Sequence, residues 1–275
     1  MLDAPQADVM LETALCLLFA HVLADFVVQT RAMVAAKHRW PVFALHIAIV
    51  AVTAGACLGT ASASGWAALG VVVLSHATVD SIKTFALNER WTTAAPFRAL
   101  HIFLLDQTAH VVFAVVAAWL YPQAFVLGAW PKILDADAIR WLLSFYVLAG
   151  GFWLTVRVGD LLLVSFMAGF RRLWPAPRLV HNDQSEELPR AGAWIGWLER
   201  TLVFLFVLLG QFNAIGFVMA AKSVLRFEYA RRPYQSEIVI IGTLASFGWA
   251  IVIALVTRAA LVELGPGMVR PAGGG

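Results

Sequence analysis

The sequence predicts an all-α fold, a polytopic bundle of about seven transmembrane helices. Of its 275 residues, 61% are hydrophobic and only 13% are charged, and the mean hydropathy of +0.78 is well above that of soluble domains. Several apolar runs reach the roughly 20 residues that cross a bilayer. The alternating pattern of a membrane barrel does not repeat, and open strands cannot satisfy their backbone groups in lipid, so we expect these runs to be helices.

Proline, glycine and charged residues separate the apolar runs. Arg39-Trp40-Pro41 precedes the second run, and Tyr121-Pro122 follows the fourth. The predicted spans cover residues 9–30, 41–59, 66–87, 99–121, 139–164, 194–221 and 238–261. The predicted domains are a four-span His/Asp motif domain at 1–125, a fifth span within 126–170, a polar loop at 171–192 and a two-span extension at 193–275.

Basic residues in the short loops predict the orientation in the membrane. The loops after the first, third and fifth spans are basic, through Arg31, Lys37, Arg39, Arg90, Arg98, Arg171, Arg172, Arg178 and Arg190. We therefore expect these loops to be cytoplasmic, and the net charge of +3 does not indicate nucleic-acid binding. The segment from Lys222 to Arg232 is also basic and breaks the alternation. Either the sixth span is re-entrant, the fifth is two pieces, or this loop is an exception.

Three His/Asp pairs lie inside predicted spans, where ionisable residues are costly and tend to mark function. Each pair is spaced i, i+4: His21 with Asp25 in the first span, His76 with Asp80 in the third, and Asp106 with His110 in the fourth. This spacing places both members of a pair on one helix face.

The order of the residues within the pairs indicates that they converge. The fourth span runs opposite to the first and third, and its pair is inverted, so all three histidines share one depth and the aspartates lie about 6 Å nearer the cytoplasm. His46 in the second span is expected at the depth of the aspartates. Gln29 and Lys83 continue the same faces toward the cytoplasm. We expect a polar pocket that opens there.

Imidazole nitrogens and carboxylate oxygens suit a divalent or binuclear metal site. The predicted metal ligands are His21, His46, His76, Asp80, Asp106 and His110, and the predicted catalytic residues are Asp25, Asp80 and Lys83. Zinc is the favoured metal, with manganese and iron as alternatives. Such a site activates water, and a spare carboxylate or imidazole can act as general base, so metal-dependent hydrolysis is the leading hypothesis.

Two other functions use the same residues. A proton- or ion-coupled transporter would bind its ion in this cluster, although no inverted repeat is visible. A structural or regulatory membrane partner would use the pairs to clasp its helices together. Elsewhere, Arg157 and Asp160 are expected to form an internal salt bridge, and Cys16 and Cys57 to be buried and unpaired.

The motifs resemble a known family. The stretches His21–Thr30, Ser75–Lys83 and Leu105–His110 are similar to the bacterial inner-membrane domain-of-unknown-function family 3307, over about residues 10–120. The resemblance implies a multi-pass protein of the bacterial inner membrane and marks as motif positions His21, Asp25, Gln29, His46, His76, Asp80, Lys83, Asp106 and His110. A looser likeness is to membrane-bound metal-dependent hydrolases, whose His-Arg-Gly-x-Thr-His-Ser motif this chain lacks.

The expected substrate is a lipid or another amphiphile that reaches the site from the bilayer. A phosphorylated head group is favoured, because Lys83, Arg90 and Arg98 lie near the predicted mouth and could bind anionic oxygens. The expected partners are thus membrane lipids and an amphiphilic small molecule, with no nucleic acid. A homo-oligomer is compatible with the sequence.

Overall fold

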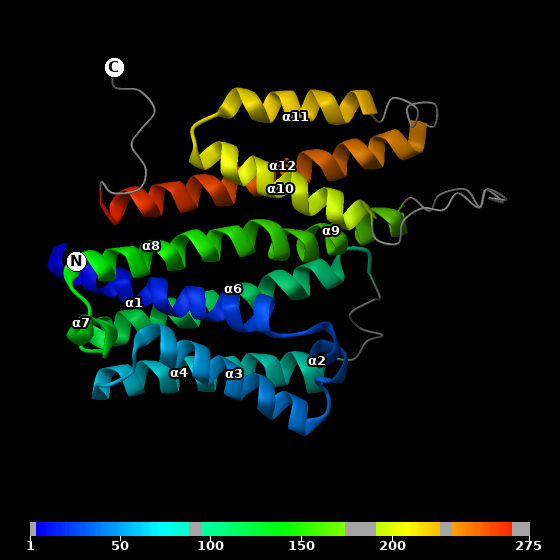
Figure 1. Ribbon diagram of the computed structural model, residues 1–275. Coiled ribbons are helices and arrows are strands. Elements are labelled where there is room, and N and C mark those ends of the chain that lie inside the picture. Colours follow the sequence, from blue (N-terminus) through cyan, green and yellow to red (C-terminus); the bar gives the residue numbers. More distant parts are fainter. Residues whose placement is uncertain (1–3, 88–94, 174–190, 226–232, 266–275) are drawn as a thin grey trace, which may run out of the picture. The chain divides into compact units, whose positions relative to one another are not determined.

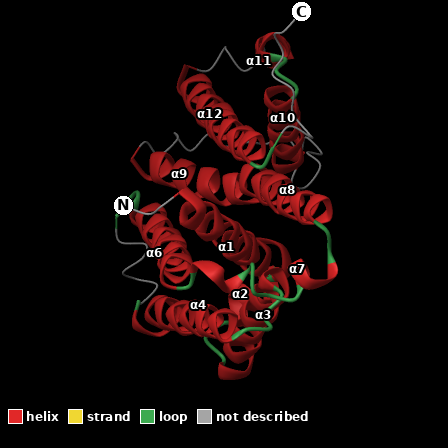
Figure 2. Cartoon of the chain, turned by 90° about the vertical axis from the view of Figure 1, so that its left-hand side faces the viewer, coloured by secondary structure: helices red, strands yellow, loops and turns green. Residues whose placement is uncertain are grey.

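The computed structural model describes residues 4–87, 95–173, 191–225 and 233–265, which contain helices and short connections but no strand (Figures 1 and 2). The α-helices are α1 (Ala4–Val22), α2 (Arg31–Ala36), α3 (Trp40–Leu58), α4 (Ala63–Ser81), α6 (Arg98–Leu120), α7 (Trp130–Ile133), α8 (Ala136–Trp153), α9 (Gly159–Leu173), α10 (Ala191–Leu208), α11 (Phe212–Leu225) and α12 (Pro233–Glu263). Three π-helical segments and one 3₁₀ turn complete the order: η1 (Leu23–Val28), η2 (Ile82–Ala86), η4 (Leu154–Val158) and the 3₁₀ turn η3 (Pro122–Ala124).

Six helical stretches in the described residues are long and apolar enough to cross a membrane. They cover Ala7–Val28, Trp40–Leu58, Ala63–Ala86, Arg98–Leu120, Ala136–Leu173 and Glu237–Glu263. The all-α, polytopic class predicted from the sequence is therefore confirmed, and the first four spans begin and end within a few residues of the predicted positions.

The sixth predicted span, 194–221, is not one helix. α10 ends at a turn in which Gly210 has a left-handed φ of 70°, and α11 then runs back antiparallel to α10 (Figure 1). With 14 residues, α11 is about 21 Å long, shorter than the ~30 Å hydrocarbon layer. The hairpin returns Lys222, in the last turn of α11, to the end where α10 begins. This hairpin is the arrangement that the re-entrant alternative expects, and which of the three alternatives holds in the membrane stays a prediction. Arg226, Arg231 and Arg232 of the basic segment lie outside the described residues.

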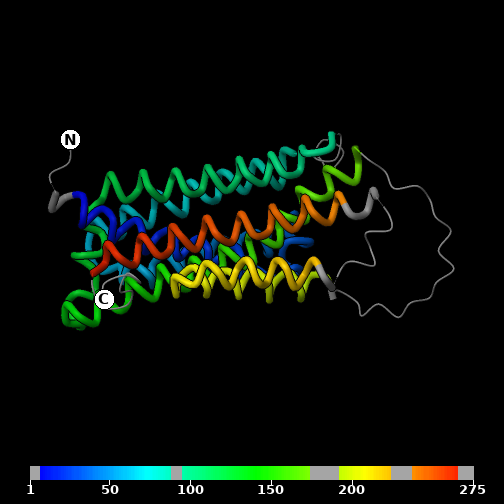
Figure 3. Tube along the Cα trace, turned by 90° about the horizontal axis from the view of Figure 1, so that it is seen from above, coloured from blue at the N-terminus to red at the C-terminus, as the bar shows by residue number. Residues whose placement is uncertain are grey.

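The chain forms two compact units. The first comprises residues 1–92 and 102–153, and the second comprises 93–101 and 154–275. In the first unit α1 packs on α3 and α8, and α3 packs on α4. In the second unit α12 packs on α10 and α9, with α10 and α12 running alongside each other (Figure 3). Most of the predicted polar loop at 171–192 lies outside the described residues.

The first unit buries its histidines and aspartates and exposes many of its large apolar side chains. His46 is fully buried and Asp80 is 2% exposed, whereas Val52, Leu74 and Leu105 are 70–71% exposed. A water-soluble domain shows the reverse distribution, because large apolar surfaces are unfavourable in water. The exposed apolar side chains match the hydrocarbon of a bilayer, and the interior is left for polar chemistry.

Hydrogen bonds between connections hold one end of the first unit together. Thr13 on α1 donates through Oγ1 to the carbonyl of Pro122 at 2.7 Å and accepts from the amide of Phe125 at 3.2 Å. The amide of Ala129 donates to the carbonyl of Gly59 at 2.6 Å. We call this region, residues 58–60 and 122–130 with Thr13, the tied end.

Close backbone packing at the tied end requires a glycine at position 128. A Cβ on Gly128 would lie 2.6–2.9 Å from the carbonyl oxygens of Leu58, Phe125 and Gly59. These are backbone atoms, so none can rotate away. The connection after α6 therefore fits tightly against the end of α3.

Candidate metal centre

Four membrane helices of the first unit bring the predicted polar residues together. α1 and η1 supply His21 and Asp25, α3 supplies His46, α4 supplies His76 and Asp80, and α6 supplies Asp106 and His110. All seven side chains are at most 9% exposed. Each helix contributes one polar face, as the i, i+4 spacing predicted, and the opposite faces carry apolar side chains.

Four ligand atoms lie around the contact between His46 and His76. We call them the tetrahedral group, after the coordination that four such ligands would give a zinc ion: Asp25 Oδ1, His46 Nε2, His76 Nε2 and Asp80 Oδ2. The two nitrogens lie 3.1 Å apart. Asp80 Oδ2 lies 3.1 Å from His46 Nε2 and 3.3 Å from His76 Nε2. Asp25 Oδ1 lies 3.4 Å from each of these nitrogens. Separations of this size are close to the ~3.3 Å between neighbouring ligands of a tetrahedral ion whose Zn–N and Zn–O bonds are about 2.0 Å long. His46, His76 and Asp80 can each place one ligand atom within 4.8 Å of the others, so these three side chains could hold one ion.

The tetrahedral group has the ligand types that a divalent cation prefers. His46 and His76 point the same ring nitrogen at each other, and a neutral imidazole has only one N–H to donate. Asp25 Oδ1 is buried and makes no hydrogen bond within the described residues. Buried acceptors without partners cost about 1–3 kcal/mol each. A divalent cation at the centre would satisfy all four atoms together.

Gln29 contacts the ring nitrogen of His46 that lies outside the tetrahedral group. Gln29 Nε2 lies 3.1 Å from His46 Nδ1, and in this amide orientation Gln29 donates to the ring. If the amide is turned by 180°, its oxygen accepts the proton of Nδ1, and Nε2 then has a lone pair for a metal. Metal-binding histidines commonly have a partner of this kind on the other ring nitrogen.

A second set of buried atoms lies beside the tetrahedral group. His110 donates through Nδ1 to the carbonyl of Asp106 at 2.7 Å, so its Nε2 carries a lone pair. His21 Nε2 lies 3.2 Å from the side-chain oxygen of Gln107, which leaves a lone pair on Nδ1. Neither His110 Nε2 nor His21 Nδ1 has a hydrogen-bond partner among the described residues, and the same holds for Asp106 Oδ1. We call His21, Asp106 and His110 the neighbouring group.

The two groups are continuous. The His110 ring lies 4.1 Å from the His76 ring and stacks on the His21 ring at 5.1 Å, measured between centroids. Asp80, Asp106 and His110 can each place one ligand atom within 4.8 Å of the others. His21 Nδ1 lies 3.6 Å from Asp25 Oδ2, the oxygen outside the tetrahedral group. Asp25 and Asp80 therefore belong to the tetrahedral group and also lie close to residues of the neighbouring group.

Two lysines flank the carboxylates. Lys83 Nζ lies 2.6 Å from Asp106 Oδ2, and Lys37 Nζ lies 2.5 Å from Asp80 Oδ2. Lys83 is 40% exposed and Lys37 is 14% exposed. Sequence reasoning selected Lys83 but missed Lys37, because Lys37 follows α2 and shares no helical spacing with the motifs. Its position in the first basic loop was the available signal.

Of the other predicted mouth residues, Arg98 begins α6 and groups with the second unit, while Arg90 lies outside the described residues.

Two of the three motif-bearing helices, α1 and α4, continue as π-helix at the site. η1 contains Asp25 and η2 contains Lys83. A π turn has an additional residue and rotates the side chains that follow, and such turns are frequent at functional sites. The residue types in these two segments do not predict a π-helix.

The family that matches the chain covers mostly residues of the first unit. No curated protein and no solved structure shows significant similarity to the chain. One family matches part of it, described as "Protein of unknown function (DUF3307)", over residues 14–131. The matched segment contains all seven residues of the two groups. Residues 14–131 are thus a DUF3307 region, as the three motifs predicted.

Proposed function

We propose that the first unit is a metal-dependent hydrolase that acts inside the bilayer on a lipid or another amphiphile. The observation that carries this proposal is the tetrahedral group, whose five measured separations are 3.1–3.4 Å. Two imidazoles and two carboxylates at this spacing suit zinc, with manganese or iron as alternatives.

The neighbouring group supplies what the tetrahedral group lacks. A metal with four protein ligands has no position left for water and usually has a structural role. Asp106 and His110, together with Asp80, offer three ligand atoms within 4.8 Å of one another, which suits a second ion with an open position. A divalent metal there would activate water as a nucleophile near neutral pH. The second oxygen of Asp25, Oδ2, lies outside the tetrahedral group and would be free to accept the proton of the water.

The lysines favour an anionic substrate. A phosphorylated head group could bind between Lys37 and Lys83 and thereby release Asp80 and Asp106 from their ion pairs. Lys83 continues the polar face of α4 toward the next basic loop, and Lys37 itself lies in the first basic loop. We propose on this basis that the protein lies in the bacterial inner membrane and that the site opens to the cytoplasm.

Metal content and turnover test the proposal together. Purified full-length protein in detergent is mildly chelated, reloaded with zinc and measured by mass spectrometry. Phosphatidylglycerol and an isoprenyl phosphate then serve as substrates. We expect about two zinc ions per chain in the wild type, and about one together with no hydrolysis in Asp106→Asn. His101→Ala, an exposed histidine on the same helix as Asp106, should leave both properties unchanged.

Each result has a defined meaning. Folded wild-type protein that takes up no metal would refute the metal centre. Bound zinc with no turnover on any amphiphile would refute the hydrolase and favour a structural clasp, in which loss of the metal lowers stability only.

Proton- or ion-coupled transport is the second candidate, and one observation favours it. A chain of contacts leads from half-exposed Lys83 to the centre: Lys83 to Asp106 at 2.6 Å, Asp106 to Gln107 at 2.9 Å, and Gln107 to His21 at 3.2 Å. Such a chain can conduct protons in carriers. Ion-dependent flux in liposomes without hydrolysis would favour transport. Hydrolysis of an amphiphile in the absence of an ion gradient would favour the hydrolase instead.

A further inference from the structure

The second unit contains a cavity of about 430 Å³ lined by residues of α9, α10, α11 and α12. Part of its wall is apolar, through side chains such as Leu163, Met167, Ile195 and Val239. The remainder is charged, through Asp160, Arg171, Glu199, Arg200 and Lys222. An apolar wall with a few convergent charges is typical of sites that bind amphiphilic ligands.

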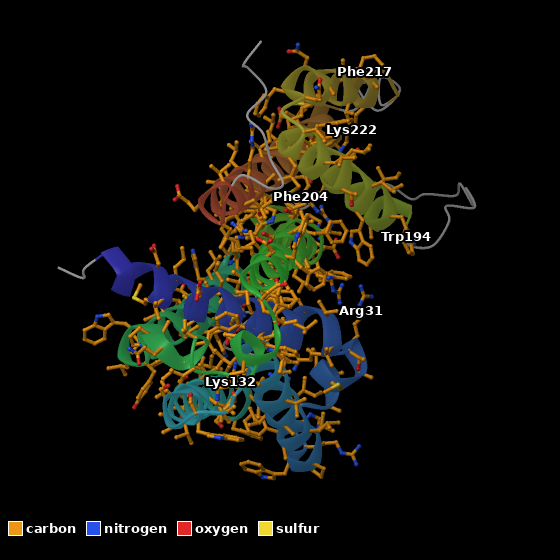
Figure 4. All side chains as sticks on the ribbon, turned by 60° about the vertical axis from the view of Figure 1, so that its left-hand side comes forward. Arg31, Lys132, Trp194, Phe204, Phe217 and Lys222 are labelled. Atoms are coloured by element: carbon orange, nitrogen blue, oxygen red, sulfur yellow. The ribbon has the colours of Figure 1, made fainter. Side chains whose placement is uncertain are left out.

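The charged wall has an excess of positive charge. Lys222, labelled in Figure 4, reaches from α11 to Glu199 on α10, with Nζ 2.5 Å from Oε2. Arg200 Nη2 lies 3.6 Å from Asp160 Oδ1. In these two ion pairs the charges of Lys222 and Arg200 are balanced by Glu199 and Asp160. The positive charge of Arg171 is then left over in the cavity wall. The cavity therefore favours an anion.

Arg200 has an unsatisfied donor in this wall. Its side chain is 3% exposed, and its terminal nitrogens donate to Ser246 Oγ at 3.4 Å and to the carbonyl of Val156 at 3.1 Å. Its Nε is buried without an acceptor among the described residues. A guanidinium has five N–H donors, and leaving one unpaired in an apolar interior is costly. Arg200 lines the cavity, so its guanidinium group would favour a ligand oxygen placed beside it.

We infer that this cavity binds an anionic amphiphile of the phospholipid type. Its phosphate would lie against Arg171 and Arg200, since guanidinium groups bind phosphate oxygens through strong paired hydrogen bonds. Its acyl chains would lie along the apolar wall of α9 and α12, two helices that belong to candidate membrane spans. The site uses no residue of the metal centre, so it is independent of the proposed hydrolase.

Lipid binding to the delipidated full-length protein tests this inference. Native mass spectrometry measures the binding of dioleoyl-phosphatidylglycerol, dioleoyl-phosphatidylcholine and inorganic phosphate. We expect phosphatidylglycerol to bind at least tenfold more tightly than phosphatidylcholine. Arg171→Gln should weaken that binding about tenfold, because it removes a charge-assisted hydrogen bond. Arg172→Gln is the matched control, since Arg172 is also exposed but does not line the cavity.

A second variant fills the space without changing a charge. Val164 lines the cavity and is 57% exposed, so Val164→Trp should fold normally and also weaken binding. Equal affinity for the two lipids, or equal effects of Arg171→Gln and Arg172→Gln, would overturn the inference. If inorganic phosphate binds as tightly as phosphatidylglycerol, the ligand is a free anion, and the inference that the cavity binds an amphiphile is wrong.

Discussion

Replacement of His46 by alanine is the sharpest test of the tetrahedral group. His46 Nε2 takes part in three of the five short separations, to His76, Asp80 and Asp25. Structural zinc sites contribute about 10–16 kcal/mol, or about 3 kcal/mol for each of four ligands. The loss of one ligand should therefore weaken zinc binding about a hundredfold. Competition between the detergent-solubilised protein and a fluorescent zinc chelator measures this affinity directly.

Two other histidines provide the comparison for His46→Ala. His110→Ala removes a buried ring from the neighbouring group and should leave the tight zinc affinity unchanged while one weaker ion is lost. His101→Ala should change neither. Equal losses of tight binding in His46→Ala and His110→Ala, in variants with a normal gel-filtration profile, would show that the tetrahedral geometry does not define the site.

Three further predictions concern stability, each measured as the thermal unfolding midpoint of detergent-solubilised protein. A chelator should lower the wild-type midpoint, since a ligand at 100 times its dissociation constant stabilises by about 2.7 kcal/mol, and no shift would count against a bound metal. Thr13→Val should lower the free energy of unfolding by about 2–4 kcal/mol, because two backbone groups lose their hydrogen-bond partner. Thr78→Val, at an exposed threonine that bonds only within its own helix, should lower it much less. Equal losses of stability would contradict the role of Thr13 in the tied end. Gly128→Ala should cost about 1–3 kcal/mol through its three backbone clashes, whereas Gly70→Ala, which meets nothing within 4 Å, should be neutral or slightly stabilising.

The fold was predictable where apolar runs end at strong breakers. Trp40-Pro41 begins α3 and Tyr121 follows α6, because proline suits the first turn of a helix but not its interior. The break at Gly210 was not predictable in the same way. Glycine is common inside membrane helices, so a single glycine in an apolar run does not mark a turn. The misplaced positive charge at Lys222 was the only trace of the hairpin in the sequence.

The site was predictable to the level of helix faces. Inversion of the pair in α6 correctly indicated that His110 would face His76. The division into two groups was not predictable, since Asp25 lies in a π turn and each carboxylate has two oxygens that can turn toward different neighbours. The geometry places Asp25 in the tetrahedral group, where it could bind metal, although the sequence suggested a catalytic role for it. The metal-binding and catalytic roles of all these residues stay predictions.

The tied end has a mechanical consequence for the first unit. Thr13, Gly59 and Ala129 link connections that are far apart in sequence, so this end should behave as a fixed pivot. At the other end α1 and α4 finish in π turns, whose wider hydrogen-bonding pattern is easier to rearrange than that of an α-helix. Thermal motion should then separate the helices most at the end opposite the tied end, beside Lys83. Amide exchange should be slowest around Phe125 and fastest along η2, so a substrate arriving from the bilayer would meet the one end of the bundle that can part.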